Sequence, residues 1–349
     1  MTFYQELQLN QAGSKALIRS SASRREKMRH TAVYLFKIFL TMAFCMAFVM
    51  GYSSIFGDDN SIVGVVVLLC IMVFRYADFG MKISGSLFSL AVIFAILAFG
   101  PRLANQAGLF GELIINLVCI FALLVLGCHN VLMANHSTIV LGYLLLYGYD
   151  VTGEAYLMRL VSIAAGALLT GLVFYRNHRN LTYKRSLADV LKEFRLHSLR
   201  TRWQLTLTFG VSTAVFLGGL FHFPRRMWIG IAAMSVLLPF RSDLKERVKG
   251  RIPGNMIGAV VFMGICFFLP PSVFPYIGVI GGIGVGLSAT YQWQAVFNSL
   301  GAMAIATGIL GLPGAIIFRI LNNILGSVYG LAFEKASSRI LNRIAPSEA

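Results

Sequence analysis

The chain has 349 residues, of which 57% are hydrophobic and only 13% are charged, and its mean hydropathy is +0.74. Soluble globular proteins carry about 25% charged residues, so this composition excludes an ordinary soluble domain and predicts an all-α polytopic membrane protein. The formal net charge of +16 does not call for a nucleic-acid partner, because the basic residues follow the alternation of loops expected in a membrane.

The first 30 residues are polar and basic. They predict a cytoplasmic segment (1–30) without a cleavable signal peptide, because the apolar run that follows is too long for one. Apolar stretches separated by polar loops then predict about twelve membrane-spanning helices, some shorter than the ~17 residues of a full crossing. The predicted spans lie near 31–56, 61–74, 80–99, 107–127, 136–149, 156–175, 203–221, 228–240, 253–269, 272–289, 293–311 and 313–333.

The basic residues support this alternation of sides. With the N-terminus in the cytoplasm, nearly all lysines and arginines fall in inside segments, as the positive-inside rule expects. The exceptions are Arg102, Arg225 and Arg226 in outside loops, and Lys37, Arg159 and Arg319 within spans. We therefore expect a multi-pass protein of the inner (cytoplasmic) membrane with both termini in the cytoplasm.

A basic linker, 176–202, separates the two sets of six spans. Within 183–200, apolar residues recur at helical spacing, which predicts an amphipathic helix lying on the cytoplasmic surface. These apolar residues are Leu187, Val190, Leu191 and Phe194.

An internal repeat relates the two sets of spans. Met158–Gly166 (MRLVSIAAG) and Phe318–Gly326 (FRILNNILG) each place an arginine seven residues before a glycine. Two weaker matches occur in the same order: Ile83–Ala91 with Ile252–Val260, and Phe74-Arg75 with Phe240-Arg241. An even number of spans in each copy predicts parallel repeats (31–175 and 203–333, with a cytoplasmic tail at 334–349) and a substrate path at their interface.

The repeated arginines, Arg159 and Arg319, have two interpretations. They could reach the outer head groups or pair with Glu112 or Glu154, since a charge inside a span is costly. Alternatively, they are symmetry-related cations beside an anion path, because guanidinium binds carboxylate through two parallel hydrogen bonds.

The segment Met227–Val261 resembles the fusaric acid resistance protein family, also called aromatic acid exporters. The resemblance rests on Trp228, Pro239, Arg251-Ile252, Gly254 and Gly258-Ala259, and on the later pair Arg319 and Gly326; Asn255 replaces the usual threonine. It implies an inner-membrane exporter of small, often aromatic, carboxylic acids. More distantly the chain is similar to plant aluminium-activated malate transporters, whose six-span subunits form a basic anion pore. Many bacterial members have a large cytosolic domain between the halves, where this chain has only the linker.

Other residues are weaker candidates. Glu112 is the one acidic residue clearly inside an apolar run and could couple protons, although a solvated carboxylate at a helix end is an alternative. His136, Gln292 and Gln294 begin spans at corresponding places, so they could bind a carboxylate at the inner mouth or simply start helices. Arg251 and its basic neighbours could collect anions or only signal topology.

These patterns predict a transporter of small organic anions rather than an enzyme. Trp228 could stack on the substrate or anchor at the interface. An anion channel or facilitator, and a membrane protein that handles lipid-linked substrates, are the alternative functions. The scattered cysteines and histidines predict neither a metal site nor a cofactor. The expected partners are an organic anion and membrane lipids, with a homo-oligomer or a periplasmic adaptor left open.

Overall fold

The structure, a computed structural model, describes residues 1–9, 11–239, 244–288 and 290–344, and all regular secondary structure in these residues is helical. The Phe240-Arg241 half of one repeat match and the end of the predicted tail, 345–349, lie outside the described residues. The α-helices are α1 (Phe3–Gln8), α2 (Gln11–Arg19), α3 (Arg24–Phe56), α4 (Ser61–Phe74), α5 (Ile83–Gln106), α6 (Leu109–Gly127), α7 (His136–Gly148), α8 (Gly153–His178), α9 (Leu187–Lys192), α10 (Leu199–Leu220), α11 (Met227–Val236), α12 (Leu244–Phe268), α13 (Ile277–Leu287) and α14 (Tyr291–Ile344). Three short 3-10 helices are η1 (Asp58–Asn60), η2 (Val131–Met133) and η4 (Pro271–Tyr276).

Every predicted span falls on a helix. Seven helices of the described residues are long and apolar enough to cross a membrane: α3, α5, α6, α8, α10, α12 and α14. The three stretches that were short in the sequence contain the short helices α4, α7 and α11, whereas the predicted span 272–289 is divided between η4 and the short helix α13. The last two predicted spans are joined in α14, whose backbone breaks at Gly311 (φ 68°), a conformation that glycine adopts without strain.

The chain divides into two compact units. Unit 1 comprises Met1–Phe48 and Pro253–Ile316, and unit 2 comprises Val49–Ile252 and Ile317–Ala349. This division differs from the predicted boundary between repeats, because the first helices join the later ones in unit 1.

Unit 1 is held together by the N-terminal helices. The His30 imidazole lies 2.6 Å from the buried Glu6 carboxylate, which ties α1 to α3. The Gln11 side chain donates to the Gly286 carbonyl at 2.8 Å, so α2 satisfies a backbone group at the C-terminal end of α13. Gly281 lets α13 approach α14 closely, because a Cβ atom there would lie 2.7 Å from the Phe297 carbonyl oxygen.

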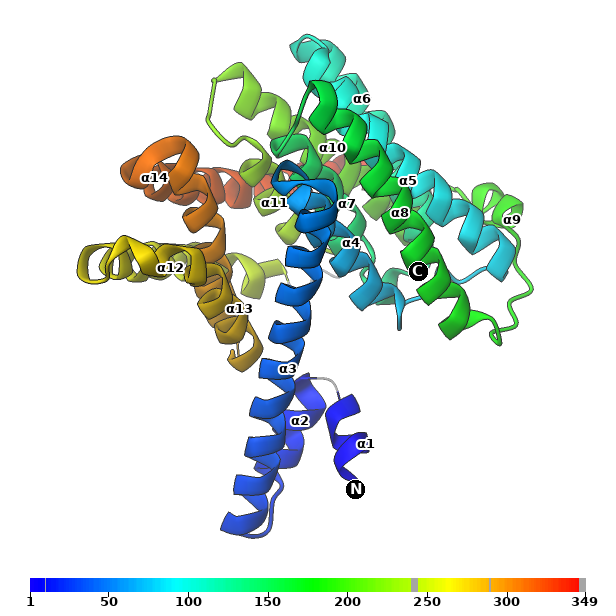
Figure 1. The fold of residues 1–349 in the computed structure, drawn as a ribbon. Coiled ribbons are helices and arrows are strands. Elements are labelled where there is room, and N and C mark those ends of the chain that lie inside the picture. The colour runs from blue at the N-terminus through cyan, green and yellow to red at the C-terminus, as the bar shows by residue number, and fades with distance from the viewer. Residues whose placement is uncertain (10, 240–243, 289, 345–349) are drawn as a thin grey trace. The chain divides into compact units, whose positions relative to one another are not determined.

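Unit 2 contains helices α4 to α11 and the last part of α14. Helix α5 lies between α6 and α8 (Figure 1), and α10 packs on both α6 and α11. At one end, the loops before α5 and before α7 meet through Asn135, whose amide donates to the Asp78 carbonyl. At the other end, the loops before α4, α8 and α11 meet around the end of α7.

The repeated Arg-x6-Gly segments occupy equivalent places in unit 2. Gly166 of α8 faces Val67 of α4, and Gly326 of α14 faces the Ile229 carbonyl and the Ala232 Cβ of α11. In both cases a Cβ atom would overlap the neighbouring short helix. The glycine therefore allows a long helix to contact a short one closely, as the sequence match predicts.

The linker between the halves differs from its prediction. Its helix, α9, spans only six residues rather than most of 183–200. Val190 is buried and the Phe194 ring packs edge-on to Phe121 of α6 at 5.5 Å, whereas Leu191 is half exposed. A capping box at Ser186 starts the helix, and the backbone leaves it at Glu193. The linker thus folds against the ends of the spans as a mostly irregular segment.

Candidate functional site

A short connection joins α7 to α8 and organises one end of unit 2. Helix α7 ends at Gly148, Tyr149 leaves the helix, and α8 begins at Gly153, whose φ of 60° is readily adopted by glycine. The segment Tyr147–Asp150, called the arginine-ringed loop below, is contacted by arginines from four different parts of the chain.

Arg159 ties this loop to the start of α4. Its Nε donates to the Asn60 Oδ1 at 3.0 Å, Nη1 donates to the Tyr149 carbonyl at 2.6 Å, and Nη2 donates to the Asp59 carbonyl at 2.9 Å. The side chain is 3% exposed. A guanidinium buried with three protein acceptors does not reach out to head groups, so snorkelling does not describe Arg159.

Arg319, the repeat partner of Arg159, is also buried in unit 2. Its guanidinium lies 5.1 Å from the centre of the Trp228 ring, within the range of a cation–π interaction. Its charge also acts on the Tyr149 hydroxyl. Arg159 thus donates to the Tyr149 carbonyl, and the charge of Arg319 acts on the hydroxyl of the same residue.

Two further arginines come from the loop before α11. Arg225 Nη1 donates to the Gly148 carbonyl at 2.9 Å, and the guanidinium lies 4.5 Å from the Tyr149 ring centre. Its Nε and Nη2 are buried and have no hydrogen-bond partner among the described residues. Arg225 has a φ of 53°, a left-handed conformation that costs roughly 1–2 kcal/mol for a residue other than glycine. The fold thus holds Arg225 in a strained conformation that places its side chain at the loop.

Arg226 and Glu112 form a buried ion pair beside this loop. Arg226 Nη1 lies 2.8 Å from Glu112 Oε2, and the Tyr147 hydroxyl donates to Glu112 Oε1 at 2.6 Å. Glu112 is 3% exposed, so the interpretation of this residue as a solvated carboxylate at a helix end is wrong. The apolar run around Glu112 indicated burial, but its partner could not be identified before the loop from residue 221 was placed.

Arg102 completes the ring of arginines. Its Nη1 lies 2.7 Å from Asp150 Oδ2, and its guanidinium lies 5.6 Å from the Tyr156 ring centre. In the sequence, Arg102, Arg225 and Arg226 were only outside-loop charges. The predicted outside loops contain no other lysine or arginine, and this contrast could have identified the three arginines as candidates.

The other predicted site residues are distributed elsewhere. His136 is buried at the opposite end of α7, about 18 Å along the helix axis from Gly148, where its ring packs edge-on to Trp203 at 5.0 Å. Trp228 is buried beneath Arg319, and Arg251 is buried in α12. Gln292 and Gln294 start α14 in unit 1, whereas the other predicted site residues belong to unit 2.

A second feature that the sequence did not reveal is a pocket of about 270 Å³ at the His136 end of unit 2. It is lined by the start of α10, the residues after α11 and the last turns of α14. The buried Arg202 donates to Asn342 Oδ1 at 2.6 Å, and the Trp203 indole donates to the Leu237 carbonyl at 3.0 Å. The pocket thus combines a cation, an aromatic ring and polar side chains.

Metal-binding chemistry is not indicated by the residues present. Among residues 1–9, 11–239, 244–288 and 290–344, no cluster of three histidine, cysteine or acidic side chains could hold a metal ion. All five cysteines are free thiols. The chemistry of the site is therefore that of guanidinium groups, aromatic rings and one buried carboxylate.

The fold and this site define a class: an all-helical, multi-pass membrane protein with a basic, aromatic end. Residues 213–333 match the family model described as fusaric acid resistance protein-like. The match confirms the predicted family resemblance and indicates a membrane transport protein. No curated protein and no solved structure matches the chain.

Proposed function

We propose that this protein moves small organic anions, and aromatic carboxylates in particular, outward across the cytoplasmic membrane. The observation that supports this proposal is the arginine-ringed loop, Tyr147–Asp150, which has five arginines around it: Arg102, Arg159, Arg225, Arg226 and Arg319. Two carboxylates, Glu112 and Asp150, offset part of this charge. The resulting excess of positive charge suits an anion more than a neutral or cationic substrate.

Aromatic rings beside the cations support the choice of aromatic acids. Arg225 lies over Tyr149, Arg226 over Tyr147 and Arg319 over Trp228. When the face of a guanidinium stacks on an aromatic ring, the N–H donors at its edge can still bind a carboxylate. The neighbouring rings can contact the apolar part of an aromatic acid.

The arginines have different roles in this proposal. Arg225 has two buried N–H groups without a partner among the described residues, so it would bind the carboxylate directly. Arg319 would contribute its charge from the other side of Tyr149. Arg159 already donates to three protein acceptors, so it would position the loop and the start of α4. Glu112, buried next to this charge, is the candidate for proton coupling.

The test is flux of labelled benzoate in proteoliposomes of the purified protein, with benzamide as the neutral probe. A hydrogen bond to a charged group contributes about 1.5–3 kcal/mol, so Arg225→Gln and Arg319→Gln should each lower benzoate flux about ten- to a hundredfold. Arg75→Gln is the matched control, because Arg75 stacks on Tyr76 at 4.4 Å in an exposed loop at the other end of unit 2. Unchanged flux in both site variants, or an equal loss in the control, would reject the arginine-ringed loop as the anion site.

A further inference from the structure

A second basic cluster lies at the end of unit 2 opposite the arginine-ringed loop. The loop after α6 and the linker around α9 enclose a pocket of about 500 Å³. Its walls include Gly80, His129, Tyr183, Lys184, Arg185 and Arg200. We call it the linker pocket. The linker pocket has no role in the transport function proposed above.

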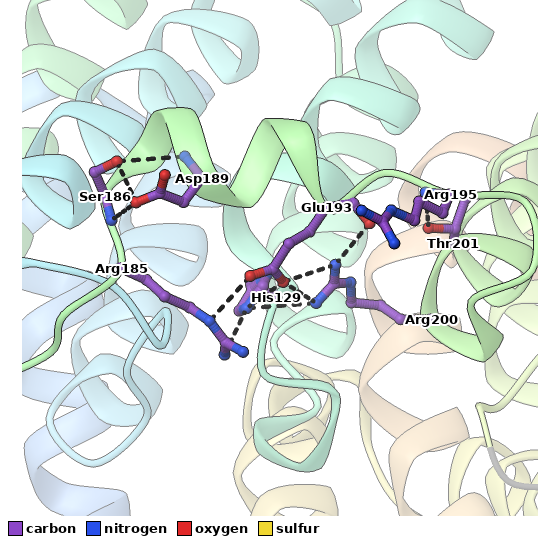
Figure 2. A network of polar contacts seen from close by, with 8 residues as sticks. All are labelled: His129, Arg185, Ser186, Asp189, Glu193, Arg195, Arg200 and Thr201. Carbon is purple, nitrogen blue, oxygen red and sulfur yellow. Dashed lines mark hydrogen bonds and ion pairs between the residues drawn. The ribbon is translucent and has the colours of Figure 1, made fainter.

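One acidic residue bridges the two arginines of the linker pocket, as Figure 2 shows. Arg185 Nε lies 3.0 Å from Glu193 Oε1, and Arg200 Nη2 lies 3.4 Å from Glu193 Oε2. Lys184 adds a third cation to the wall, and the Tyr183 hydroxyl interacts with the Asp78 carboxylate. Glu193 is about one-third exposed, so it can leave the arginines for water without becoming a buried charge.

His129 lies beneath the two arginines. Its Nε2 is 3.3 Å from Arg185 Nη1 and 3.4 Å from Arg200 Nη1, so this nitrogen accepts and the ring is neutral. Burial, together with the charges of Arg200 and Arg185, lowers the pKa of His129 to about 4 despite the opposing effect of Glu193. The side chain is 4% exposed, and its Nδ1 has no hydrogen-bond partner among the described residues.

We propose that the linker pocket binds a phosphate group. Arginine forks match phosphate oxygens in pairs, and Arg185 and Arg200 line the pocket from before and after α9. A phosphomonoester carries about −1.5 to −2 charges and several strong acceptor oxygens, which fits three cations and a tyrosine hydroxyl better than a carboxylate does. A lipid head group and a soluble phosphorylated molecule both offer this chemistry.

Glu193 would act as the internal competitor for this ligand. Because its carboxylate occupies the two guanidinium groups that the phosphate would bind, the ligand must displace it. Removal of the Glu193 charge should therefore strengthen phosphate binding, whereas removal of either arginine should weaken it. A variant that merely unfolded the linker would not bind more tightly, so the two opposite effects separate a binding site from a structural network.

The experiment measures binding to the purified full-length protein in detergent. Inorganic phosphate is titrated by calorimetry, and phosphatidic acid and phosphatidylcholine are compared by native mass spectrometry. Arg185→Gln and Arg200→Gln should each weaken binding at least tenfold, and Glu193→Gln should strengthen it several-fold. Arg195→Gln is the matched control, because Arg195 belongs to the same segment and is exposed, and its backbone N–H, not its side chain, contacts Thr201 (Figure 2).

The outcomes separate the two sources of phosphate. Binding of inorganic phosphate supports a site for soluble ligands, and binding of phosphatidic acid alone supports a lipid head-group site. Absence of binding to every probe, or equal binding by the Arg185→Gln, Arg200→Gln and Arg195→Gln variants, would overturn the proposal. Benzoate flux measured on the same variants is expected to stay near the wild-type value, which keeps this test independent of the proposed transport function.

Discussion

The close contact between α14 and α11 makes a sharp prediction for Gly326→Ala. A Cβ atom on residue 326 would lie 2.6 Å from the Ala232 Cβ and even closer to the Ile229 carbonyl oxygen. The backbone of α11 cannot rotate away as a side chain can, so the two helices must separate. The perturbation therefore tests whether the Arg-x6-Gly repeat serves helix packing.

The expected magnitude follows from two opposing effects. Overpacking in a closely packed region costs about 1–3 kcal/mol, and alanine favours a helix over glycine by about 0.8–1.0 kcal/mol. The difference is a net loss of up to about 2 kcal/mol, which corresponds to a fall in Tm of up to roughly 4–8 °C. Gly166→Ala should cost a similar amount, because its Cβ would overlap a methyl group of Val67, and a buried valine within a helix has one strongly preferred rotamer.

The assay is thermal unfolding of the purified protein in detergent, followed by the loss of monodisperse protein in gel filtration. Gly171→Ala provides the control, because it lies on α8 like Gly166 and has no heavy atom within 4 Å of its added Cβ. Its Tm should stay the same or rise slightly. If Gly326→Ala and Gly171→Ala have the same Tm, the close contact with α11 contributes nothing and the packing argument is refuted.

Three other changes give further predictions. Glu112→Gln replaces a charge-assisted contact to Arg226 by a neutral one, so the loss of about 1 kcal/mol should lower Tm by roughly 2 °C. If Glu112 couples protons, benzoate flux in this variant should also lose its response to a pH gradient. Benzoate flux in the control variant Asp150→Asn should keep that response. Asn322→Ala removes donations to the Pro224 and Arg225 carbonyls (2.8 and 3.2 Å) and should lower both Tm and benzoate flux, whereas a Tm equal to wild type would show that these bonds do not hold the loop. For His129, the folded-state pKa of about 4 lies below the ordinary value of 6.5, so the unfolded chain binds the proton first and stability is lost as pH falls from about 6.5 toward 4. His129→Gln should therefore lose less Tm than wild type between about pH 7 and pH 5, and an equal loss would contradict this sign.

The sequence predicts the helices and the family resemblance, but not the extent of the linker helix. Apolar runs predict helices well because membrane-spanning backbone must satisfy its own hydrogen bonds, and all the predicted spans fall on helices. The family resemblance was also predicted correctly from the residues after Met227. In contrast, the short extent of α9 could not be predicted, because the apolar spacing within 183–200 does not indicate where the helix ends or that Glu193 pairs with Arg185 and Arg200.

The candidate site was only partly accessible from the sequence. Arg159 and Arg319 stood out because a charge within an apolar run is costly. Arg225 did not, because a loop arginine looks solvated until Tyr149 and the Gly148 carbonyl are placed beside it. The proposed inner residues His136 and Gln292 belong to different units, which hydropathy alone could not show.

The segments around Arg159 and Arg319 differ in how they hold the loop before the neighbouring short helix. In the first half, Arg159 itself donates to the Asp59 carbonyl just before α4. In the second half, Asn322, one turn after Arg319, donates to the equivalent carbonyls just before α11. Because the amide performs this structural task, Arg319 lies over Trp228 instead, with its charge acting on Tyr149. Arg159 is therefore engaged in holding the loop, whereas Arg319 lies over an aromatic ring, which is the arrangement behind its proposed role in anion binding.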